Sequence, residues 1–403
     1  MSQSRRIIVA SHAWYGDVVG GAFRLASEFA EYMAEQGHQV SYLCCAKEAG
    51  YDGSLRETVR GVDVVRYRPY SNPLGGLARL RFHLRESRKL AKMLNKERPV
   101  QFVSGHSPLQ ALGAMQAMKH DSVHCTYTVH SPFDDELLSN ASGGRAGLLQ
   151  KMASLVARRV DRRNCQLADQ VQCDSRYTLS VMMQRHRRAV GNKGLVAPGW
   201  VETTRFVPVN DRLAIRATLG EHWNFDGPVF FTLRRLQNRM GLETLVDACQ
   251  SLAQQGLKFR TLIGGSGPLR ESLQERIHAA GLQESVQLLG RLPEEQLADC
   301  YAAADCFVLP TKALECFGLI VLEAFACNTP VIASNVAAIP ELAERQGSDW
   351  MFEPGDVVQL ADRMQAYLDR RLKPTVDLRS VAMEYDKKKV LAEWERVLLE
   401  RRA

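Results

Sequence analysis

Two glutamates flank a stretch of backbone that could bind an anion. Glu315 precedes Phe317 and Gly318, and Glu323 lies eight residues after Glu315, in a segment predicted to be a helix from about Leu319. The first N–H groups of a helix have no partner within it and can bind phosphates, while carboxylates accept hydrogen bonds from hydroxyl groups. The N–H groups available here are those of Gly318, Leu319 and Ile320. The pattern suits a sugar diphosphate, although Glu315 could equally be a solvated loop residue and Glu323 a residue that favours a helix start.

A second helix start of this kind occurs near the N-terminus. Residues 6–11 form an apolar run typical of a buried strand, and apolar residues then recur at helical spacing over residues 23–37. Residues 39–45 predict the next strand, which completes a strand–helix–strand unit. Gly20 and Gly21 stand where that helix begins, so backbone N–H groups there could reach an anion.

The elements that would position these groups alternate along the whole chain. Further strands are predicted at 62–66, 100–104, 123–129, 169–173, 194–197, 229–233, 259–264, 286–289, 306–309 and 331–333, with a linker at 198–202. Strands that alternate with helices twice over predict an α/β protein with two doubly wound parallel sheets. We therefore expect two Rossmann-like domains over residues 1–197 and 198–385, and a helix over 386–403 that could pack back on the first. Ligands of such sheets bind beyond the carboxyl ends of the strands, so we expect the site in a cleft between the domains.

Composition excludes several classes of protein. The 403 residues are 45% hydrophobic and 24% charged, as in ordinary globular proteins. No apolar run approaches the roughly 18 residues that span a bilayer. The ten cysteines form no CxxC pair and mostly lie in apolar segments. Buried, reduced thiols in a cytoplasmic protein are therefore expected, rather than disulfides or a metal site.

Charge is unevenly distributed between the two halves. Residues 1–200 contain 28 Lys and Arg against 17 Asp and Glu, a net +11, whereas residues 201–403 contain 24 against 28, a net −4. The segment 77–96 combines an apolar stripe with seven cations, which favours a peripheral helix on an anionic membrane. A solvated helix face and an acidic acceptor are the alternatives. Nucleic acid is not expected, because aromatic residues are not interleaved with the cations.

Several segments together resemble the retaining GT-B glycosyltransferases of family 4. The two glutamates match that family's E-x7-E pattern, with Phe-Gly after the first. Other matching segments are EAFACNTPVIAS from residue 323, IPE at 339–341, TLRRL at 232–236, GGSGP at 264–268, LGRL at 289–292, YAAAD at 301–305 and PGWVE at 198–202. The resemblance covers nearly all of the second half. In the first half it rests on the glycine pair, His106 and residues 128–130.

The resemblance implies roles for the candidate residues. Catalytic roles would fall to Glu315, Arg235 and His130, which would contact the donor-sugar hydroxyls, neutralise the departing diphosphate and approach the donor sugar, respectively. Donor binding would fall to Gly20, Gly21, Arg239, Leu292, Phe317, Gly318, Leu319, Ile320 and Glu323. Within that set, Glu323 would hold the ribose, and Leu292 would meet the base through its backbone. His106 is expected to be structural.

The sequence departs from the family pattern at two positions. Met240 stands where the family usually has lysine, and Asn328 replaces a glycine. Because the charge of the leaving group must still be stabilised, we expect Arg239 to complete a diphosphate clamp with Arg235. The alternative is that Arg239 is a surface charge.

The expected function is transfer of a hexose-type sugar, with retention, from a UDP- or GDP-linked donor to an acceptor sugar, glycolipid or small molecule. The setting would be cell-envelope, polysaccharide or glycolipid synthesis, in the cytoplasm or at the inner face of the membrane. No metal and no cofactor are expected, because no Asp-x-Asp pair ends a predicted strand. The acidic run 134–136 is predicted to be a surface turn, and the loop 264–269 lacks the third glycine of a nicotinamide-binding motif. The alternatives are a GT-B-like nucleotide-sugar epimerase and a non-catalytic nucleotide-sugar-binding protein.

Overall fold

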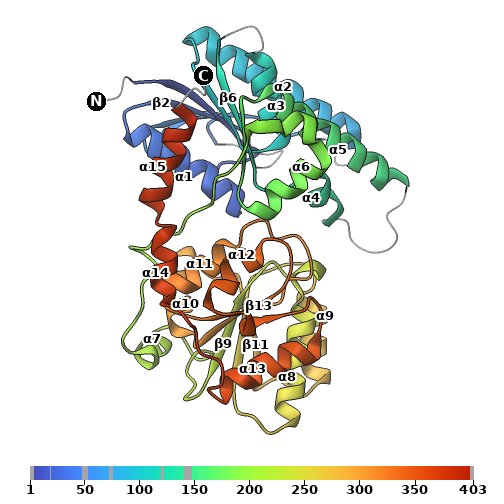
Figure 1. Ribbon diagram of the computed structural model, residues 1–403, viewed down its shortest axis with the longest axis vertical. Helices are drawn as coiled ribbons and strands as arrows, with labels where there is room; N and C mark the ends of the chain where they lie inside the picture. The colour runs from blue at the N-terminus through green and yellow to red at the C-terminus, as the bar shows by residue number, and fades with distance from the viewer. Residues whose placement is uncertain are drawn as a thin grey trace. The chain divides into compact units, whose positions relative to one another are not determined.

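The computed structural model describes residues 4–18, 20–47, 53–71, 76–118, 122–139 and 148–399. The chain divides into two compact units. Unit 1 comprises Met1–Gly199 together with Val390–Ala403, and unit 2 comprises Trp200–Lys389. Each unit is an α/β structure built around its own sheet (Figure 1).

The sheet of unit 1 has eight strands. They are β1 (Arg6–Ala10), β2 (Gln39–Cys45), β3 (Arg56–Val59), β4 (Val62–Tyr67), β5 (Phe102–Gly105), β6 (His124–Val129), β7 (Gln170–Cys173) and β8 (Gly194–Val196). Their spatial order is β3-β4-β2-β1-β5-β6-β7-β8. Only the edge pair β3–β4 is antiparallel among these neighbours. The strand order reverses between β1 and β5, which is where such sheets bind ligands.

Helices cover this sheet. They are α1 (Gly21–Glu35), α2 (Gly76–Glu97), α3 (Pro108–Ala117), α4 (Phe133–Ser139), α5 (Leu148–Leu167), α6 (Arg176–Val190) and α15 (Lys387–Leu399), which belongs to unit 1 from Val390 onward. Helices α2 and α3 approach closely because Gly113 lacks a side chain. A Cβ there would lie 2.7 Å from the Cβ of Ser87 and 2.9 Å from the carbonyl oxygen of Leu84. This contact fixes the buried face of α2 against α3 and leaves its other face to solvent.

The last helix, α15, packs within unit 1. The Trp394 ring lies 6.0 Å from the His106 ring at an interplanar angle of 18°, and its Nε1–H donates to the carbonyl oxygen of Pro198 at 3.0 Å. Glu395 accepts a hydrogen bond from the hydroxyl of Tyr32 on α1 at 3.0 Å. Residues 400–403, the end of the predicted C-terminal helix, lie outside the described residues.

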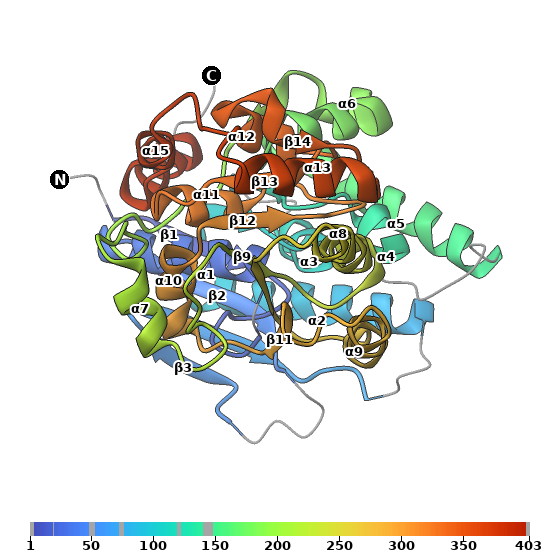
Figure 2. The ribbon, with the colours of Figure 1, turned by 90° about the horizontal axis from the view of Figure 1, so that it is seen from below.

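The sheet of unit 2 has six parallel strands. They are β9 (Val229–Leu233), β10 (Arg260–Gly264), β11 (Val286–Gly290), β12 (Cys306–Leu309), β13 (Val331–Ser334) and β14 (Met351–Phe352), in the order β11-β10-β9-β12-β13-β14. The helices are α7 (Arg212–Thr218), α8 (Leu242–Gln254), α9 (Arg270–Ala279), α10 (Leu297–Ala303), α11 (Leu319–Ala326), α12 (Ile339–Ala343), α13 (Val357–Leu368) and α14 (Leu378–Glu384). Helices α10 and α11 lie on one face of the sheet and α8 and α13 on the other, each over its own apolar core (Figure 2).

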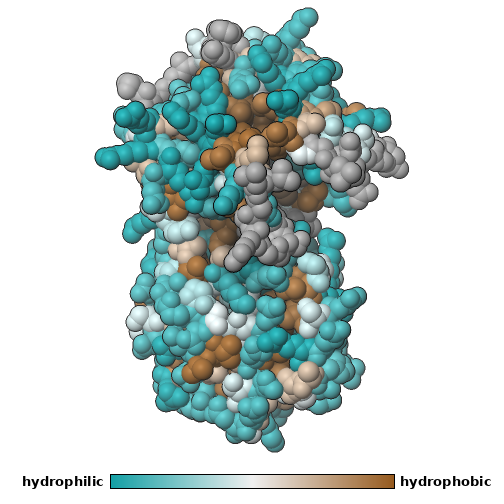
Figure 3. All heavy atoms as spheres, turned by 90° about the vertical axis from the view of Figure 1, so that its right-hand side faces the viewer, coloured by the Kyte–Doolittle hydropathy of each residue, from teal (hydrophilic) through white to brown (hydrophobic). Residues whose placement is uncertain are grey.

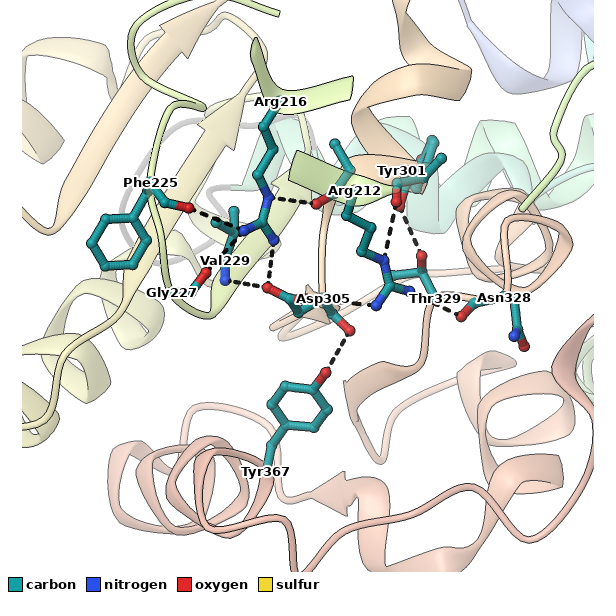
Figure 4. A network of polar contacts seen from close by, with 12 residues as sticks. Arg212, Arg216, Phe225, Gly227, Val229, Tyr301, Asp305, Asn328, Thr329 and Tyr367 are labelled. Carbon is teal, nitrogen blue, oxygen red and sulfur yellow. Dashed lines mark hydrogen bonds and ion pairs between the residues drawn. The ribbon is translucent and has the colours of Figure 1, made fainter. Parts of the chain in front are cut away.

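A buried guanidinium ties the first helix of unit 2 to its sheet. Arg216 of α7 donates to the carboxylate of Asp305, at the start of β12, and to the carbonyl oxygens of Ala303, Phe225 and Gly227 (Figure 4). The same carboxylate accepts the backbone N–H of Val229 at 2.7 Å. The ion pair of Arg216 with Asp305, together with these carbonyl contacts, therefore anchors the segment between Trp200 and β9 to the sheet.

The predicted fold class is confirmed, and every predicted strand is present within a residue or two of its expected bounds. Two strands were not predicted. Strand β3 has the sequence RETV and three exposed residues, so it lacks an apolar period. Strand β14 has only two residues. Both lie at sheet edges, where burial imposes the weakest sequence pattern.

The cysteines match the expectation from composition. All ten cysteines are buried, as expected, and each is a free thiol. Burial raises the pKa of Cys249 to about 12, which makes its thiol a poor nucleophile at neutral pH. Within the described part of the chain, no helix has the length and apolar character needed to cross a bilayer.

Candidate functional site

The candidate site of unit 2 lies where its strand order reverses. Strands β9 and β12 are neighbours in the sheet, and the segments that follow them carry chemistry. Arg234 and Arg235 come directly after β9, and the loop that contains Glu315 comes after β12. Because parallel strands end at the same edge of a sheet, the topology brings the arginines and Glu315 together.

The backbone of the loop that carries Glu315 is held by hydrogen bonds to neighbouring segments. The Leu314 carbonyl oxygen accepts a hydrogen bond from Nη1 of Arg239 at 2.8 Å, and the Arg239 carbonyl oxygen accepts the N–H of Lys312 at 2.8 Å. The Glu315 carbonyl oxygen accepts the N–H of Ala338 at 2.9 Å. Leu314 adopts a left-handed conformation with φ 55°, which these bonds sustain. Glu315 therefore projects from a fixed loop.

Sequence reasoning missed Arg234, the arginine that contacts Glu315. Nη2 of Arg234 lies 2.9 Å from Oε2 of Glu315 and 3.0 Å from Oγ1 of Thr311. The Arg234 side chain is 7% exposed and that of Glu315 is 21% exposed. Arg235, the predicted cation, is exposed on the same loop. Two adjacent arginines give no sequence signal of which one turns inward.

Arg239 and Met240 lie beside this pair. Arg239 is partly buried, which lowers the pKa of its guanidinium, and the charge of Arg234 lowers it further. Sδ of Met240 lies 2.9 Å from Nη2 of Arg234. Met240, which departs from the family pattern, therefore faces Arg234. The prediction that Arg239 binds a diphosphate with Arg235 stays a prediction.

Glycines allow these loops to meet. A Cβ on Gly265 would lie 1.8 Å from the carbonyl oxygen of Arg234, and one on Gly241 would lie 1.7 Å from that of Pro310. Both residues have positive φ, at 124° and 71°. These glycines therefore place the arginine loop against the sheet and against the segment after β12.

The N-terminus of α11 completes the candidate site of unit 2. Gly318 has φ 97° and precedes the first helical residues, Leu319 and Ile320. Glu323 is buried in the same helix. Phe317 packs against Tyr385, with 5.9 Å between ring centroids. Leu292 lies two residues after β11 and packs over Gly264, where a Cβ would be 2.8 Å from Cδ1 of Leu292.

Unit 1 presents a polar chain along the carboxyl ends of β5, β6 and β7. Asp174 accepts a hydrogen bond from Nδ1 of His130 at 2.9 Å, and Nε2 of His130 lies 3.0 Å from Nδ1 of His106. Nε2 of His106 lies 3.0 Å from the hydroxyl of Ser104. In a neutral His130, the carboxylate selects the Nδ1–H tautomer, so Nε2 accepts from His106. A sugar hydroxyl on that nitrogen would replace the bond to His106, and the predicted role of His130 stays a prediction.

The glycine pair stands at the start of α1, as expected. Gly21 is the first helical residue and Gly20 is its N-cap residue, whose carbonyl oxygen accepts the N–H of Arg24 at 2.9 Å. Val19, just before the pair, lies outside the described residues.

The acidic run 134–136 is not a surface turn, and that prediction was wrong. The run forms the first turn of α4, and Asp134 is fully buried. Its carboxylate accepts from Nε of Arg158 at 2.6 Å and from Nη1 of Arg185 at 2.7 Å. Two arginines of the basic half therefore neutralise a buried charge. Among the described residues, no His, Cys, Asp or Glu side chains cluster in a way that could hold a metal ion.

Both the sequence and the fold of this chain are similar to those of known proteins. A family model for "Glycosyl transferases group 1" matches residues 220–389, and one for "Glycosyltransferase Family 4" matches residues 19–205. A putative colanic acid biosynthesis glycosyltransferase of Escherichia coli is 31% identical over 163 residues, 38% of this chain and 40% of that protein. A GDP-mannose-dependent alpha-(1-6)-phosphatidylinositol monomannoside mannosyltransferase of Mycolicibacterium smegmatis is 34% identical over 195 residues, 46% of this chain and 49% of that protein. The chain thus matches less than half the length of these relatives.

Solved structures share this fold over almost the whole of this chain, and HepE is one of them. HepE of Anabaena, crystallised with UDP and glucose, superposes with a TM-score of 0.75 at 18% identity, covering 98% of this chain and all of that one. This likeness supports the assignment of the two-unit GT-B fold.

The buried histidines make the stability of unit 1 depend on pH. Burial lowers the pKa of His12, His106 and His186, and burial with the charges of His12 and Arg79 lowers that of His83 to about 4. Below about pH 6.5 these histidines bind protons in the unfolded chain, whereas in the folded chain they stay neutral. The free energy of unfolding therefore decreases as the pH is lowered. Burial raises the pKa of Asp161 to about 7, which opposes this loss, but this is a single carboxyl against four histidines.

We expect unit 1 to unfold at lower urea concentration at pH 5 than at pH 7. His83→Gln should make this pH dependence shallower. His222→Gln, at an exposed position of unit 2, is the control and should leave it unchanged. Identical pH dependence in the wild type and His83→Gln would contradict the account.

Proposed function

We propose, because the chain belongs to the family 4 GT-B glycosyltransferases, that it transfers a hexose-type sugar from a nucleoside diphosphate sugar to an acceptor with retention of anomeric configuration. The observation that carries this proposal is the Glu315 carboxylate, held at 2.9 Å by Arg234 at the strand-order reversal of unit 2. A fixed, partly exposed carboxylate suits recognition of sugar hydroxyls, and the start of α11 suits a diphosphate.

The donor is proposed from chemistry and from relatives. One relative is described as GDP-mannose-dependent, and HepE was crystallised with UDP and glucose. We propose a UDP- or GDP-linked hexose for this chain. The acceptor would be a sugar, a glycolipid or a small molecule, and the setting the synthesis of a cell-envelope glycan, by analogy with the colanic acid relative.

The catalytic task is stabilisation of the departing diphosphate. Glycosyl transfer passes through an oxocarbenium-like state, and negative charge develops on the leaving group. Exposed Arg235 and the N–H groups at the start of α11 would stabilise that charge, because fixed donors need no reorganisation during the reaction. Glu315 would bind the sugar hydroxyls, Glu323 the ribose and the backbone of Leu292 the base. Gly20, Gly21 and His130 are proposed donor contacts from unit 1.

The direct test is a panel of nucleotide sugars offered with simple acceptors. Thermal shift selects the donor, since a ligand of the folded state raises apparent stability. Nucleotide release that is matched by glycosylated product, with the donor's anomeric configuration kept, supports the proposal. Epimerised donor without transfer would make the chain an epimerase, and donor binding without turnover would make it a binding protein.

We expect turnover to survive chelation. The proposed diphosphate contacts are Arg235, Arg239 and backbone N–H groups, none of which needs a metal ion. Product formation in EDTA should equal that in Mg²⁺ and Mn²⁺. Activity abolished by EDTA and restored by either ion would overturn the metal-independent proposal.

Glu315 and Glu323 should differ in what they support. Glu315→Gln is expected to lower kcat by about a hundredfold with little change in the affinity for free nucleotide, because its contact is with the reacting sugar. Glu323→Ala should weaken both donor and free nucleotide. Glu344→Gln, at an exposed position, is the matched control. Equal losses of free-nucleotide affinity in both site variants would contradict these roles.

The surface of α2 supports a peripheral membrane proposal. All seven cations of this helix are exposed, and a hollow of about 490 Å³ is lined by Arg81, Leu84, Arg85, Arg88, Lys89, Lys92 and Gln116. Leu77, Met152 and Leu155 are each more than half exposed at the starts of α2 and α5. Hydrophobic side chains gather among hydrophilic ones on this side of unit 1 (Figure 3). Cations beside exposed apolar residues suit anionic lipid headgroups.

We expect the protein to co-sediment with vesicles that contain anionic lipid, and less so as salt is raised. Arg88→Gln/Lys89→Gln/Lys92→Gln should weaken this binding about tenfold or more, since each surface cation contributes about 1 kcal/mol. The control is Lys258→Gln/Lys373→Gln/Lys388→Gln, which removes the same charge from exposed positions of unit 2. Equal binding by both triple variants would place the contact elsewhere, and no binding at low salt would favour the acidic acceptor.

A further inference from the structure

The contacts of Arg234 differ from those of a surface arginine. Its side chain is 7% exposed, and one nitrogen, Nη2, meets a carboxylate, a hydroxyl and a thioether. Its Nε is buried, with no hydrogen-bond partner among the described residues. A buried charge is costly unless it is paired, so the 2.9 Å contact with Glu315 is what this guanidinium depends on.

The backbone of Arg234 is as constrained as its side chain. Its N–H donates to the carbonyl oxygen of Gly264 at 3.0 Å. A Cβ on residue 265 would lie only 1.8 Å from the carbonyl oxygen of Arg234, so residue 265 must be glycine. Both the backbone and the guanidinium of Arg234 are therefore held in place. The Glu315 carboxylate is oriented by its contact with Arg234 rather than by solvent.

Met240 contributes by being uncharged. Its Sδ lies 2.9 Å from the same Nη2 that meets Glu315, and the Met240 side chain is buried. A cation in this place would sit against a guanidinium in a poorly solvated environment, where like charges repel strongly. Arg239 is already close enough for its pKa to be lowered by Arg234. Of the two positions in direct contact, 234 and 240, only one can therefore carry a charge, and in this chain it is residue 234.

We infer that Arg234 is a positioning residue that holds the Glu315 carboxylate toward its ligand, and that it can do so only while residue 240 is uncharged. The inference deepens the proposed function, because the activity of Glu315 rests on that proposal. The exclusion between cations at residues 234 and 240 does not rest on it, since it is a property of the folded protein alone.

The test is a double-mutant cycle read out by unfolding and by turnover. The variants are Arg234→Met, Met240→Lys and the two combined, with Met240→Leu as the volume-matched uncharged control. Met240→Lys should lower the unfolding midpoint clearly below that of Met240→Leu. The double variant should unfold at a higher midpoint than Met240→Lys alone, because the introduced ammonium then has the Glu315 carboxylate without the competing guanidinium.

Turnover should follow the same cycle. Arg234→Met should lower kcat about tenfold or more while donor KM changes less, because a misdirected carboxylate still leaves the nucleotide contacts intact. Arg234→Lys, which keeps the charge and loses the planar fork, should retain part of kcat. The double variant should recover kcat relative to both single variants.

The outcomes separate this inference from the proposed function. Equal unfolding midpoints for Met240→Lys and Met240→Leu, or additive effects in the double variant, overturn the exclusion between residues 234 and 240. A change in donor KM with kcat preserved in Arg234→Met overturns the positioning role. If the wild type transfers no sugar from any donor, the proposed function fails, while the unfolding cycle still decides whether the two positions exclude each other.

Discussion

A Cβ on Gly265 would lie 1.8 Å from the carbonyl oxygen of Arg234, and one on Gly241 would lie 1.7 Å from that of Pro310. The loops that carry Arg234 and Glu315 can therefore approach only because both positions are glycine. Neither glycine needs a ligand to explain it. Their effect is to let backbone pack on backbone, so that a guanidinium and a carboxylate from segments 81 residues apart meet at the edge of the sheet.

Two kinds of buried charge occur among the described residues. Arg216 donates to one carboxylate and three carbonyl oxygens, and Asp134 accepts from two arginines. Such well-partnered groups hold segments together. Arg234 instead has a buried Nε with no partner among the described residues, and it faces a carboxylate that is partly open to solvent. An unsatisfied buried group calls for an explanation, and the positioning role inferred for Arg234 supplies one.

The sequence was sufficient to predict the fold because buried parallel strands are nearly continuous apolar runs. Strands β2, β9 and β12 have the predicted bounds for this reason, whereas the polar edge strand β3 gave no such signal. The positions of Glu315 and Gly318 in a loop before a helix were also predictable, from glycine and helix periodicity. The inward turn of Arg234 and the burial of Asp134 were not, because each depends on partners distant in the chain. Local patterns carry no information about which of two adjacent arginines finds such a partner.

The chain passes between the two units twice, at Gly199–Trp200 and again at Lys389–Val390. Unit 2 is thus a single continuous segment, which precedes the part of α15 that supplies Trp394 to unit 1. During synthesis from the N-terminus, unit 2 emerges complete while the ring of His106 still lacks the indole that stacks on it. Unit 1, although its first part is translated first, is therefore completed last. The first half of the chain reaches its finished structure only after the second has emerged from the ribosome.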